Sequence, residues 1–277
     1  MALAARQAPA GGVPAQPASS WSFAVREFRY WTTNYRRTWR GTIYSSVLNP
    51  VLYLGAIGIG LGTLVNQQHG SANLGDISYI AFLAPGLLAA AAMETGIGES
   101  TYPVLGSVKW RRTYYAAVST PLRPADLFHG HLLFTTIRLV MNCAVFMAVM
   151  IAFGAARSPW VLAALPVAVL TGLAFAAPIE AWAITVLKDT SFALIFRFGL
   201  IPLFLFSGTF FPVSQLPGWA QPIAYATPLW HGVALCRSLS LGTATIGEAL
   251  LHIGYLAALA AAGIVVGNRT YTRRLYV

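Results

Sequence analysis

The sequence predicts an all-α integral membrane protein with six transmembrane helices, preceded by an N-terminal interfacial helix. Two observations support this fold class. First, the 277 residues are 57% hydrophobic and only 9% charged, and the mean hydropathy is +0.63. Soluble domains carry about a quarter charged residues, so a chain of this composition could not cover its own surface in water. Second, six apolar stretches approach the roughly 20 residues that a helix needs to cross a bilayer.

The N-terminal region divides into a tail and an amphipathic helix. Residues 1–19 are mostly Ala, Pro, Gly and Gln without an apolar core, which predicts a disordered cytosolic tail rather than a signal peptide. In residues 20–42, apolar side chains recur every three or four positions, with arginines beside them. The apolar members are Trp21, Val25, Phe28, Trp31, Tyr35 and Trp39. This pattern is typical of a helix lying flat on a membrane, either as a plain anchor or as a mechanical strut.

The rest of the chain, residues 43–277, is predicted to form one membrane domain. Its candidate spans are residues 43–65, 79–97, 132–153, 159–187, 191–211 and 250–267. The stretch 212–249 is rich in Leu, Trp and Tyr, but prolines interrupt it repeatedly, so it cannot form one straight span. We expect this stretch to lie in the outer interface, or to re-enter it, as two short helices.

The basic residues predict the orientation of the chain. Most of the 18 Lys and Arg residues lie in the N-terminal region, in the loop 98–131, at Lys188 or near the C-terminus, whereas only Arg157 and Arg237 lie in the opposite segments. Cytosolic segments of membrane proteins carry such an excess, so both termini are predicted to be cytosolic. The net charge of +10 then faces the anionic lipid of the inner leaflet, and nothing separate indicates a nucleic-acid partner.

Motifs for catalysis and nucleotide binding are absent from the sequence. It contains no G-x-x-x-x-G-K-[ST], no G-x-S-x-G and no H-E-x-x-H. His129 and His131 are two positions apart and point to different sides of a helix, and Cys143 and Cys236 match no metal or redox spacing. We therefore expect no enzyme activity, no metal site and no cofactor in this chain. As a transporter, the chain would obtain energy from a separate protein or let a substrate move down its electrochemical gradient.

Three runs of sequence resemble a known family of transporters. The run FLAPGLLAAAAMETGIGESTYPVLGSVKWRRTYYAAVSTPLRPADLFHG, residues 82–130, resembles the second span and following cytosolic loop of ABC-2 type transporter permeases. The run FLFSGTFFPVSQLPGWAQPIAYATPLWHGVALCRSLSLG, residues 204–242, resembles their fifth span and outer re-entrant segment. NPVLYLGAIGIGLGTLV, residues 49–65, fits their first span. The similarity is greatest to the group of nodulation-type lipo-oligosaccharide exporters and daunorubicin-resistance permeases.

The resemblance implies an export function in a bacterial plasma membrane. Two six-span permease subunits, identical or different, would each dock on a cytosolic ABC ATPase that is a separate chain and holds the ATP and Mg. The expected cargo is an amphipathic substrate: a glycolipid, a lipid-linked saccharide or a hydrophobic drug. Alternative functions are a secondary transporter, which would favour ionisable residues near the midplane and internal repeats, and an integral-membrane lipid-modifying enzyme, which would need an outward-facing acid–base or metal set.

The resemblance also places a cytosolic coupling helix, which seats in a groove of the ATPase, at about residues 109–126. Aromatic and apolar side chains there can form a docking face, and basic ones can pair with acidic residues of the partner. The coupling residues implied are Lys109, Trp110, Arg111, Arg112, Tyr114, Tyr115, Val118 and Asp126. A plain solvated basic loop is the alternative interpretation.

Charged residues within the predicted spans are costly in lipid, so we expect them to be paired. They are Glu94, Arg138, Glu180 and Arg197, all in the inner half of the membrane. A hairpin around residues 188–190 would bring Glu180 level with Arg197, and Glu94 could pair with Arg138 likewise. Such pairs could be static structural contacts or a polar relay, and Arg197 could instead snorkel to the headgroups. A substrate path between the two subunits would be lined by Met93, Phe198 and Phe206.

Overall fold

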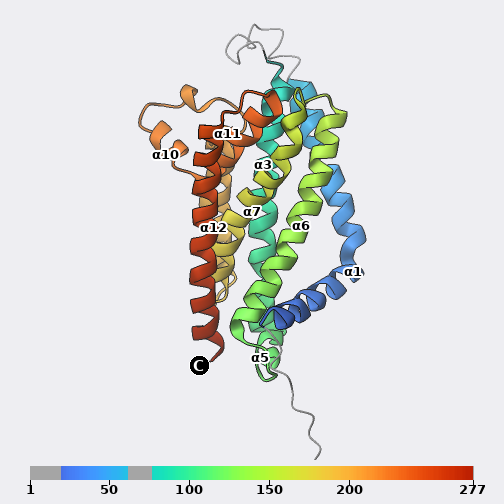
Figure 1. Ribbon diagram of the computed structural model, residues 1–277, viewed down its shortest axis with the longest axis vertical. Helices are drawn as coiled ribbons and strands as arrows, with labels where there is room; N and C mark the ends of the chain where they lie inside the picture. Colours follow the sequence, from blue (N-terminus) through green and yellow to red (C-terminus); the bar gives the residue numbers. More distant parts are fainter. Residues whose placement is uncertain (1–19, 62–76, 277) are drawn as a thin grey trace, which may run out of the picture.

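The computed structural model describes residues 20–61 and 77–276, and within these ranges the chain forms helices and no strand. The predicted tail, residues 1–19, lies outside the described residues. Four of the described helices are long and apolar enough to cross a membrane: Tyr79–Trp110, Pro124–Ala152, Pro159–Ala183 and Ile246–Leu275. They run side by side along the bundle (Figure 1). The chain is therefore a multi-pass membrane protein, as its composition predicts.

The interfacial helix and the first predicted span form one continuous helix. Helix α1 covers Ser20–Tyr53 and passes into a π-helical segment, Leu54–Leu61. Its first part crosses the foot of the bundle obliquely, and the helix then turns upward along the side (Figure 1). It packs mainly on α6, Pro124–Ala152. The two predicted elements thus belong to one helix that changes direction along its length (Figure 1), and residues 62–65 of the predicted span lie outside the described residues.

Helices α3 and α7 form the centre of the bundle. Helix α3 covers Tyr79–Ser100 and is buried along most of its length against α6, α7 and α11. Helix α7 covers Ala164–Ala183 and follows a short 3-10 segment, Pro159–Ala163. A side chain at Gly96 would collide with the backbone at Gly172, so these glycines allow the two helices to approach closely. Small residues serve this purpose in membrane helix pairs, because the lipid supplies no hydrophobic drive for association.

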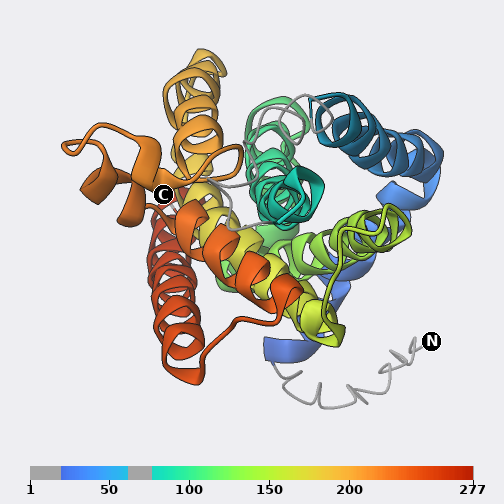
Figure 2. The same ribbon diagram turned by 90° about the horizontal axis from the view of Figure 1, so that it is seen from above.

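Long helices α6 and α12 extend beyond the apolar stretches that predicted them. Helix α6 starts at Pro124 instead of residue 132. Proline suits the first position of a helix, and the Asp126 carboxylate accepts a hydrogen bond from the backbone N–H of Arg123 in this first turn. Helix α12 covers Ile246–Leu275 instead of 250–267, and Thr245 caps its N-terminus. Polar residues at both ends can thus continue a helix past the bilayer core. Figure 2, a view along the bundle, shows α1 and α12 at its outer edges.

The predicted fifth span is shorter than expected. Three consecutive helical segments, α8 (Thr190–Leu194), a π-helical turn (Ile195–Leu200) and α9 (Ile201–Phe206), form an apolar helix that ends before residue 211. Residues 207–211 are irregular, and Gly208 has a positive φ of 82°. Arg237 donates hydrogen bonds to the carbonyls of Gly208 (2.8 Å) and Phe82 (2.9 Å). The bond to Gly208 gives this irregular segment a hydrogen-bond partner, and the bond to Phe82 connects it to α3.

The proline-rich stretch 212–249 contains two helices that differ in their surroundings and ends in the first turn of α12. A 3-10 turn, Val213–Gln215, precedes α10, Gln221–Tyr225, which is short and largely exposed. Helix α11, Pro228–Leu241, packs against α3, α7 and α12 within the bundle. Thr227 caps its N-terminus and Gly242, at φ 76°, ends it in the left-handed conformation.

The two ends of the bundle differ in what they carry. At one end lie the C-terminus, the beginning of α1 and helix α5, Thr113–Val118; we refer to it as the α5 end (Figure 1). Two short segments, α4 (Tyr102–Leu105) and a π-helical turn (Gly106–Trp110), connect α3 to α5. At the other end lie α10 and the turn between α6 and α7 (Figure 1). The loops that the charge distribution assigned to the cytosol thus gather at the α5 end.

Candidate functional site

The segment 109–126, expected to form one coupling helix, is divided among the end of a π-helical turn, Gly106–Trp110, helix α5, Thr113–Val118, and the first turn of α6, Pro124–Ala152. It reverses direction at Arg112, whose φ of 53° is unusual for a residue other than glycine. Two aromatic side chains face outward, Trp110 at 57% exposure and Tyr115 at 37%. Lys109, Arg111 and Arg112 are exposed beside them. This surface combines large apolar rings with basic groups, as a docking face requires.

Two residues of the expected coupling set do not face outward. Tyr114 is 1% exposed, and its ring packs 5.9 Å from the ring of Tyr271 in α12. Asp126 is also buried, and its Oδ2 accepts a hydrogen bond from the backbone N–H of Arg123 at 3.0 Å. The expectation that both contact a partner is therefore wrong for this conformation, because one anchors α5 to the bundle and the other caps α6. Val118 is half-buried at the end of α5.

A basic groove of about 450 Å³ lies next to the exposed aromatic residues. Its lining comes from the connection after α4, from α5, from the end of the α7 region and from α12: Val108, Lys109, Arg112, Tyr115, Val186, Leu187 and Arg274. Three of these residues are cationic, and the others are apolar or aromatic. The groove is thus suited to an acidic protein surface that also carries an apolar side chain.

A cluster of polar side chains is buried directly behind α5. His131 in α6 and Glu180 in α7 are both inaccessible, and His131 Nδ1 lies 3.0 Å from Glu180 Oε1. The hydroxyl of Tyr271 in α12 donates to the same oxygen at 3.1 Å. Together with Tyr114 and two residues of α1 described next, these side chains form what we call the Glu180 cluster. The ion pair and the tyrosine hydrogen bond together connect α6, α7 and α12 at one point.

Helix α1 closes the Glu180 cluster from the side. The Trp31 ring lies 4.4 Å from the His131 ring, and its Nε1 donates to Glu27 Oε1 at 2.8 Å. Burial raises the pKa of the Glu27 carboxyl from 4.5 to about 7. Gly130 makes this approach possible, because a side chain there would collide with Glu27. The amphipathic helix is therefore packed on the bundle through its aromatic face rather than merely lying on a membrane surface.

The charged residues predicted within the spans have other partners than expected. Arg138 donates from Nε to Glu99 Oε1 at 2.9 Å, rather than to Glu94. Glu180 pairs with His131 instead of Arg197, which is exposed and has no ion pair among the described residues. Both predicted pairings are therefore wrong. The prediction assumed that helices adjacent in sequence face each other, whereas the rotation of each helix about its axis decides the pairs.

Sequence reasoning missed four members of these polar contacts: Glu27, Glu99, His131 and Tyr271. The two-residue spacing of His129 and His131 indicates different helix faces and no shared site, although a histidine at the end of a span needs a partner as much as a charge does. Glu99 lies just beyond the predicted end of the second span. Glu27 and Trp31 are four residues apart, a spacing that places two side chains next to each other on one face of a helix. This spacing is the sequence signal that indicates their contact.

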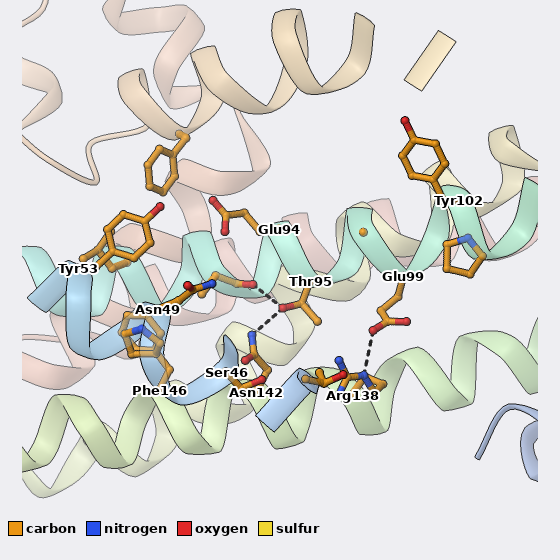
Figure 3. Close-up of a pocket in the computed structure, with 17 residues that line it drawn as sticks. Ser46, Asn49, Tyr53, Glu94, Thr95, Glu99, Tyr102, Arg138, Asn142 and Phe146 are labelled. Atoms are coloured by element: carbon orange, nitrogen blue, oxygen red, sulfur yellow. Dashed lines mark hydrogen bonds and ion pairs between the residues drawn. The ribbon is translucent and has the colours of Figure 1, made fainter. Parts of the chain in front are cut away.

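A polar groove of about 510 Å³ opens between α1, α3 and α6, and Figure 3 shows its lining. Asn142 donates to Thr95 Oγ1 at 2.7 Å, and Arg138 donates from Nη1 to the hydroxyl of Tyr35 at 2.7 Å. Glu94 is half-buried and points away from Arg138, towards the side where Tyr53 lies (Figure 3). Among the described residues it has no hydrogen bond and no ion pair. The groove thus combines a free carboxylate with amide, hydroxyl and aromatic groups.

The residues expected to line a substrate path separate into two environments. Phe198, at 76% exposure, and Phe206 line an apolar groove of about 580 Å³ between α9 and α10. Met93, in contrast, is fully buried in the core between α3 and its neighbours. Met93 therefore lines no open path in this conformation, because its face of α3 packs against other helices.

Comparison with known proteins gives consistent matches over most of the chain. Residues 21–241 match the family described as ABC-2 type transporter. Nodulation protein J of Rhizobium meliloti (strain 1021) is 32% identical over 269 residues, which cover 95% of this chain and 97% of that protein. Nodulation protein J of Rhizobium leguminosarum bv. viciae is 33% identical over 251 residues, covering 88% and 93%. Nodulation protein J of Sinorhizobium fredii is 33% identical over 265 residues, covering 94% and 96%.

Proposed function

Because this chain belongs to the ABC-2 type transporter family, and is thus the membrane subunit of an ABC transporter, we propose that it is the permease of an ATP-driven exporter. The observation that carries the proposal is the family match over residues 21–241, together with a basic, aromatic surface at the α5 end. ATP and Mg are held by a separate ATPase. Two copies of that ATPase serve two permease subunits, identical or different, in a bacterial plasma membrane.

The ATPase docks on the α5 end, which faces the cytosol together with both termini. The exposed rings of Trp110 and Tyr115 supply the apolar anchors, and Lys109, Arg111 and Arg112 surround them. Anchors of this type carry most of the binding energy in protein interfaces, while charges at the rim steer the partner. The basic groove next to them receives an acidic side of the ATPase.

The Glu180 cluster passes movement of α5 into the spans. Tyr114 fixes α5 to Tyr271 of α12, and Glu180 connects that tyrosine to His131 of α6. On the other side, the guanidinium of Arg111 lies 5.8 Å from the centre of the Trp31 ring, which joins the docking surface to α1. A displacement of α5 would therefore act on four long helices at once: α1, α6, α7 and α12. This arrangement supports a relay role for Glu180, whereas Arg197 has no part in it.

The transported molecule is amphipathic: a glycolipid, a lipid-linked saccharide or a hydrophobic drug. The apolar groove that Phe198 and Phe206 line lets the lipid-like part of such a substrate, or membrane lipid, contact the protein outside the core. The second permease subunit faces this side, so that the path lies between the two subunits.

The proposal is tested by joint expression with candidate ABC ATPases of the same organism. The two proteins should co-purify from detergent, and the permease should change the rate of ATP hydrolysis by the ATPase. The permease alone should hydrolyse no ATP. Failure of the two to associate in any detergent or lipid, or ATP hydrolysis by the purified permease, would overturn the proposal.

A further inference from the structure

The polar groove between α1, α3 and α6 is a built cavity with a charge that the coupling function does not use. Its volume of about 510 Å³ is in the range of small-molecule sites. Four lining residues carry the argument: Tyr53, Glu94, Arg138 and Phe204. They come from four different helices, so the cavity exists only when the bundle is assembled.

The positive charge in the groove is fully engaged. Arg138 forms an ion pair with Glu99 at 2.9 Å and donates to the Tyr35 hydroxyl at 2.7 Å. Its guanidinium also lies 4.4 Å from the centre of the Tyr35 ring. An anionic ligand could reach Arg138 only by displacing Glu99 from this arrangement. The groove therefore offers no free cation to a phosphate or a carboxylate.

The carboxyl group of Glu94, in contrast, is open to the groove. This carboxylate has no hydrogen bond and no ion pair in the part of the chain that the structure describes. Tyr53 and Phe204, whose ring centres are 6.4 Å apart, also line the groove. A carboxylate forms its strongest contacts with a cationic donor, and the faces of aromatic rings also attract cations. An ionisable side chain at membrane depth is costly unless a partner or a ligand compensates it.

We propose that this groove binds the cationic head of an amphipathic substrate, with Glu94 as its counter-ion and the rings of Tyr53 and Phe204 as apolar walls. The inference rests on the proposed export function and narrows the substrate class to positively charged amphipaths, such as organic amines. Lipids with phosphate heads are disfavoured, because they would meet Glu94 without reaching a free cation.

The test uses two probes of the same shape and opposite charge, tetraphenylphosphonium and tetraphenylborate. Each is equilibrated with the full-length protein in nanodiscs of zwitterionic lipid, and binding to empty nanodiscs is subtracted. We expect saturable binding of tetraphenylphosphonium only. Glu94→Gln should weaken this binding about tenfold, as the loss of one charge-assisted contact predicts. Glu94→Asp, which keeps the charge, should retain most of it.

Two further variants control for nonspecific effects. Glu248→Gln removes a carboxylate that is exposed at the start of α12 and should leave the binding unchanged. Ala91→Phe adds bulk to the wall of the groove without changing its charge and should block the probe. Unfolding temperatures show whether each variant is folded, and the comparison of the two probes needs only the wild-type protein.

Several results would overturn the proposal. These are saturable binding of both probes with equal affinity, preference for tetraphenylborate, or unchanged binding in folded Glu94→Gln or Ala91→Phe. None of them bears on ATPase coupling, so ATP-driven export of a neutral or anionic substrate would still stand. Conversely, a permease that binds the cation but does not associate with an ATPase would contradict the proposed function and not this site.

Discussion

Replacing the members of the buried pair Glu180–His131 one at a time and together gives a defined order of stabilities. Glu180→Gln removes the charge but keeps an oxygen that can accept from Tyr271. His131→Phe keeps a ring of similar shape against Trp31, 4.4 Å away, but leaves the Glu180 carboxylate without its ion-pair partner. In the double variant no uncompensated charge remains. The double variant should therefore be more stable than His131→Phe alone.

The expected magnitudes follow from the complete burial of the pair, with both side chains at 0% exposure. Removing one partner of a buried ion pair costs about 3–5 kcal/mol, because the other charge stays in a medium of low dielectric constant. This figure applies to His131→Phe. Glu180→Gln leaves a histidine that can lose its proton, so its cost is closer to the roughly 1–3 kcal/mol of an unsatisfied buried polar group. The double variant should recover at least about 2 kcal/mol relative to His131→Phe.

Reversible unfolding in mixed micelles of dodecyl maltoside and SDS, followed by tryptophan fluorescence, measures these free energies. Arg197→Ala combined with Glu180→Gln is the matched comparison, because Arg197 is exposed and its effect should add to that of Glu180 within about 0.5 kcal/mol. Additive losses for His131 and Glu180, or strong coupling between Glu180 and Arg197, would refute the pairing. If the stable double variant has lost ATPase coupling, the pair is a relay; if coupling persists, it is structural.

Three further predictions concern the docking surface, α1 and the orientation. Trp110→Ala should weaken association with the ATPase by more than about 1 kcal/mol. Trp160 is also exposed but lies near the opposite end of the bundle, so Trp160→Ala should leave the association unchanged. Equal effects of the two variants in a pull-down titration would contradict the proposed docking site. Burial raises the pKa of Glu27 from 4.5 to about 7, so the folded protein favours the neutral carboxyl. The free energy of unfolding should therefore fall by about 3 kcal/mol between pH 4.5 and 7 and stay constant at higher pH. Glu27→Gln should remove this pH dependence, and a variant with the same pH profile as the wild-type protein would refute the role of Glu27. With Cys143 and Cys236 replaced, Ser119→Cys should react with an impermeant maleimide only in opened cells and Ser214→Cys in intact cells; the reverse would invert the topology.

The apolar spans and the amphipathic α1 could be predicted from the sequence, because both depend on local patterns. A run of apolar residues of sufficient length predicts a helix in lipid regardless of its neighbours. The spacing of Trp31 and Tyr35 likewise predicts the packed face of α1. The start of α6 also depends on a local signal, since Pro124 and Asp126 lie in its first turn.

Contacts that depend on how helices are rotated could not be predicted. Helix α5 has only six residues, too few for its periodicity to distinguish Tyr114, which faces the bundle, from Tyr115, which faces outward. The partner of Glu180 comes from α6, so a hairpin with the next helix in sequence gave the wrong neighbour. The early end of α9 depends on Arg237, whose hydrogen bonds reach carbonyls of residues far away in the sequence.

ATP-dependent transport in a reconstituted membrane tests the central claim most directly. The permease and its ATPase are placed in liposomes, either together or separately, and the accumulation of tetraphenylphosphonium in inverted vesicles is followed with and without ATP and Mg. Transport should require both proteins and hydrolysable ATP, and it should continue when ion gradients are collapsed with ionophores. Uptake by the permease alone, or uptake driven by an ion gradient without ATP, would contradict the account and indicate a secondary transporter.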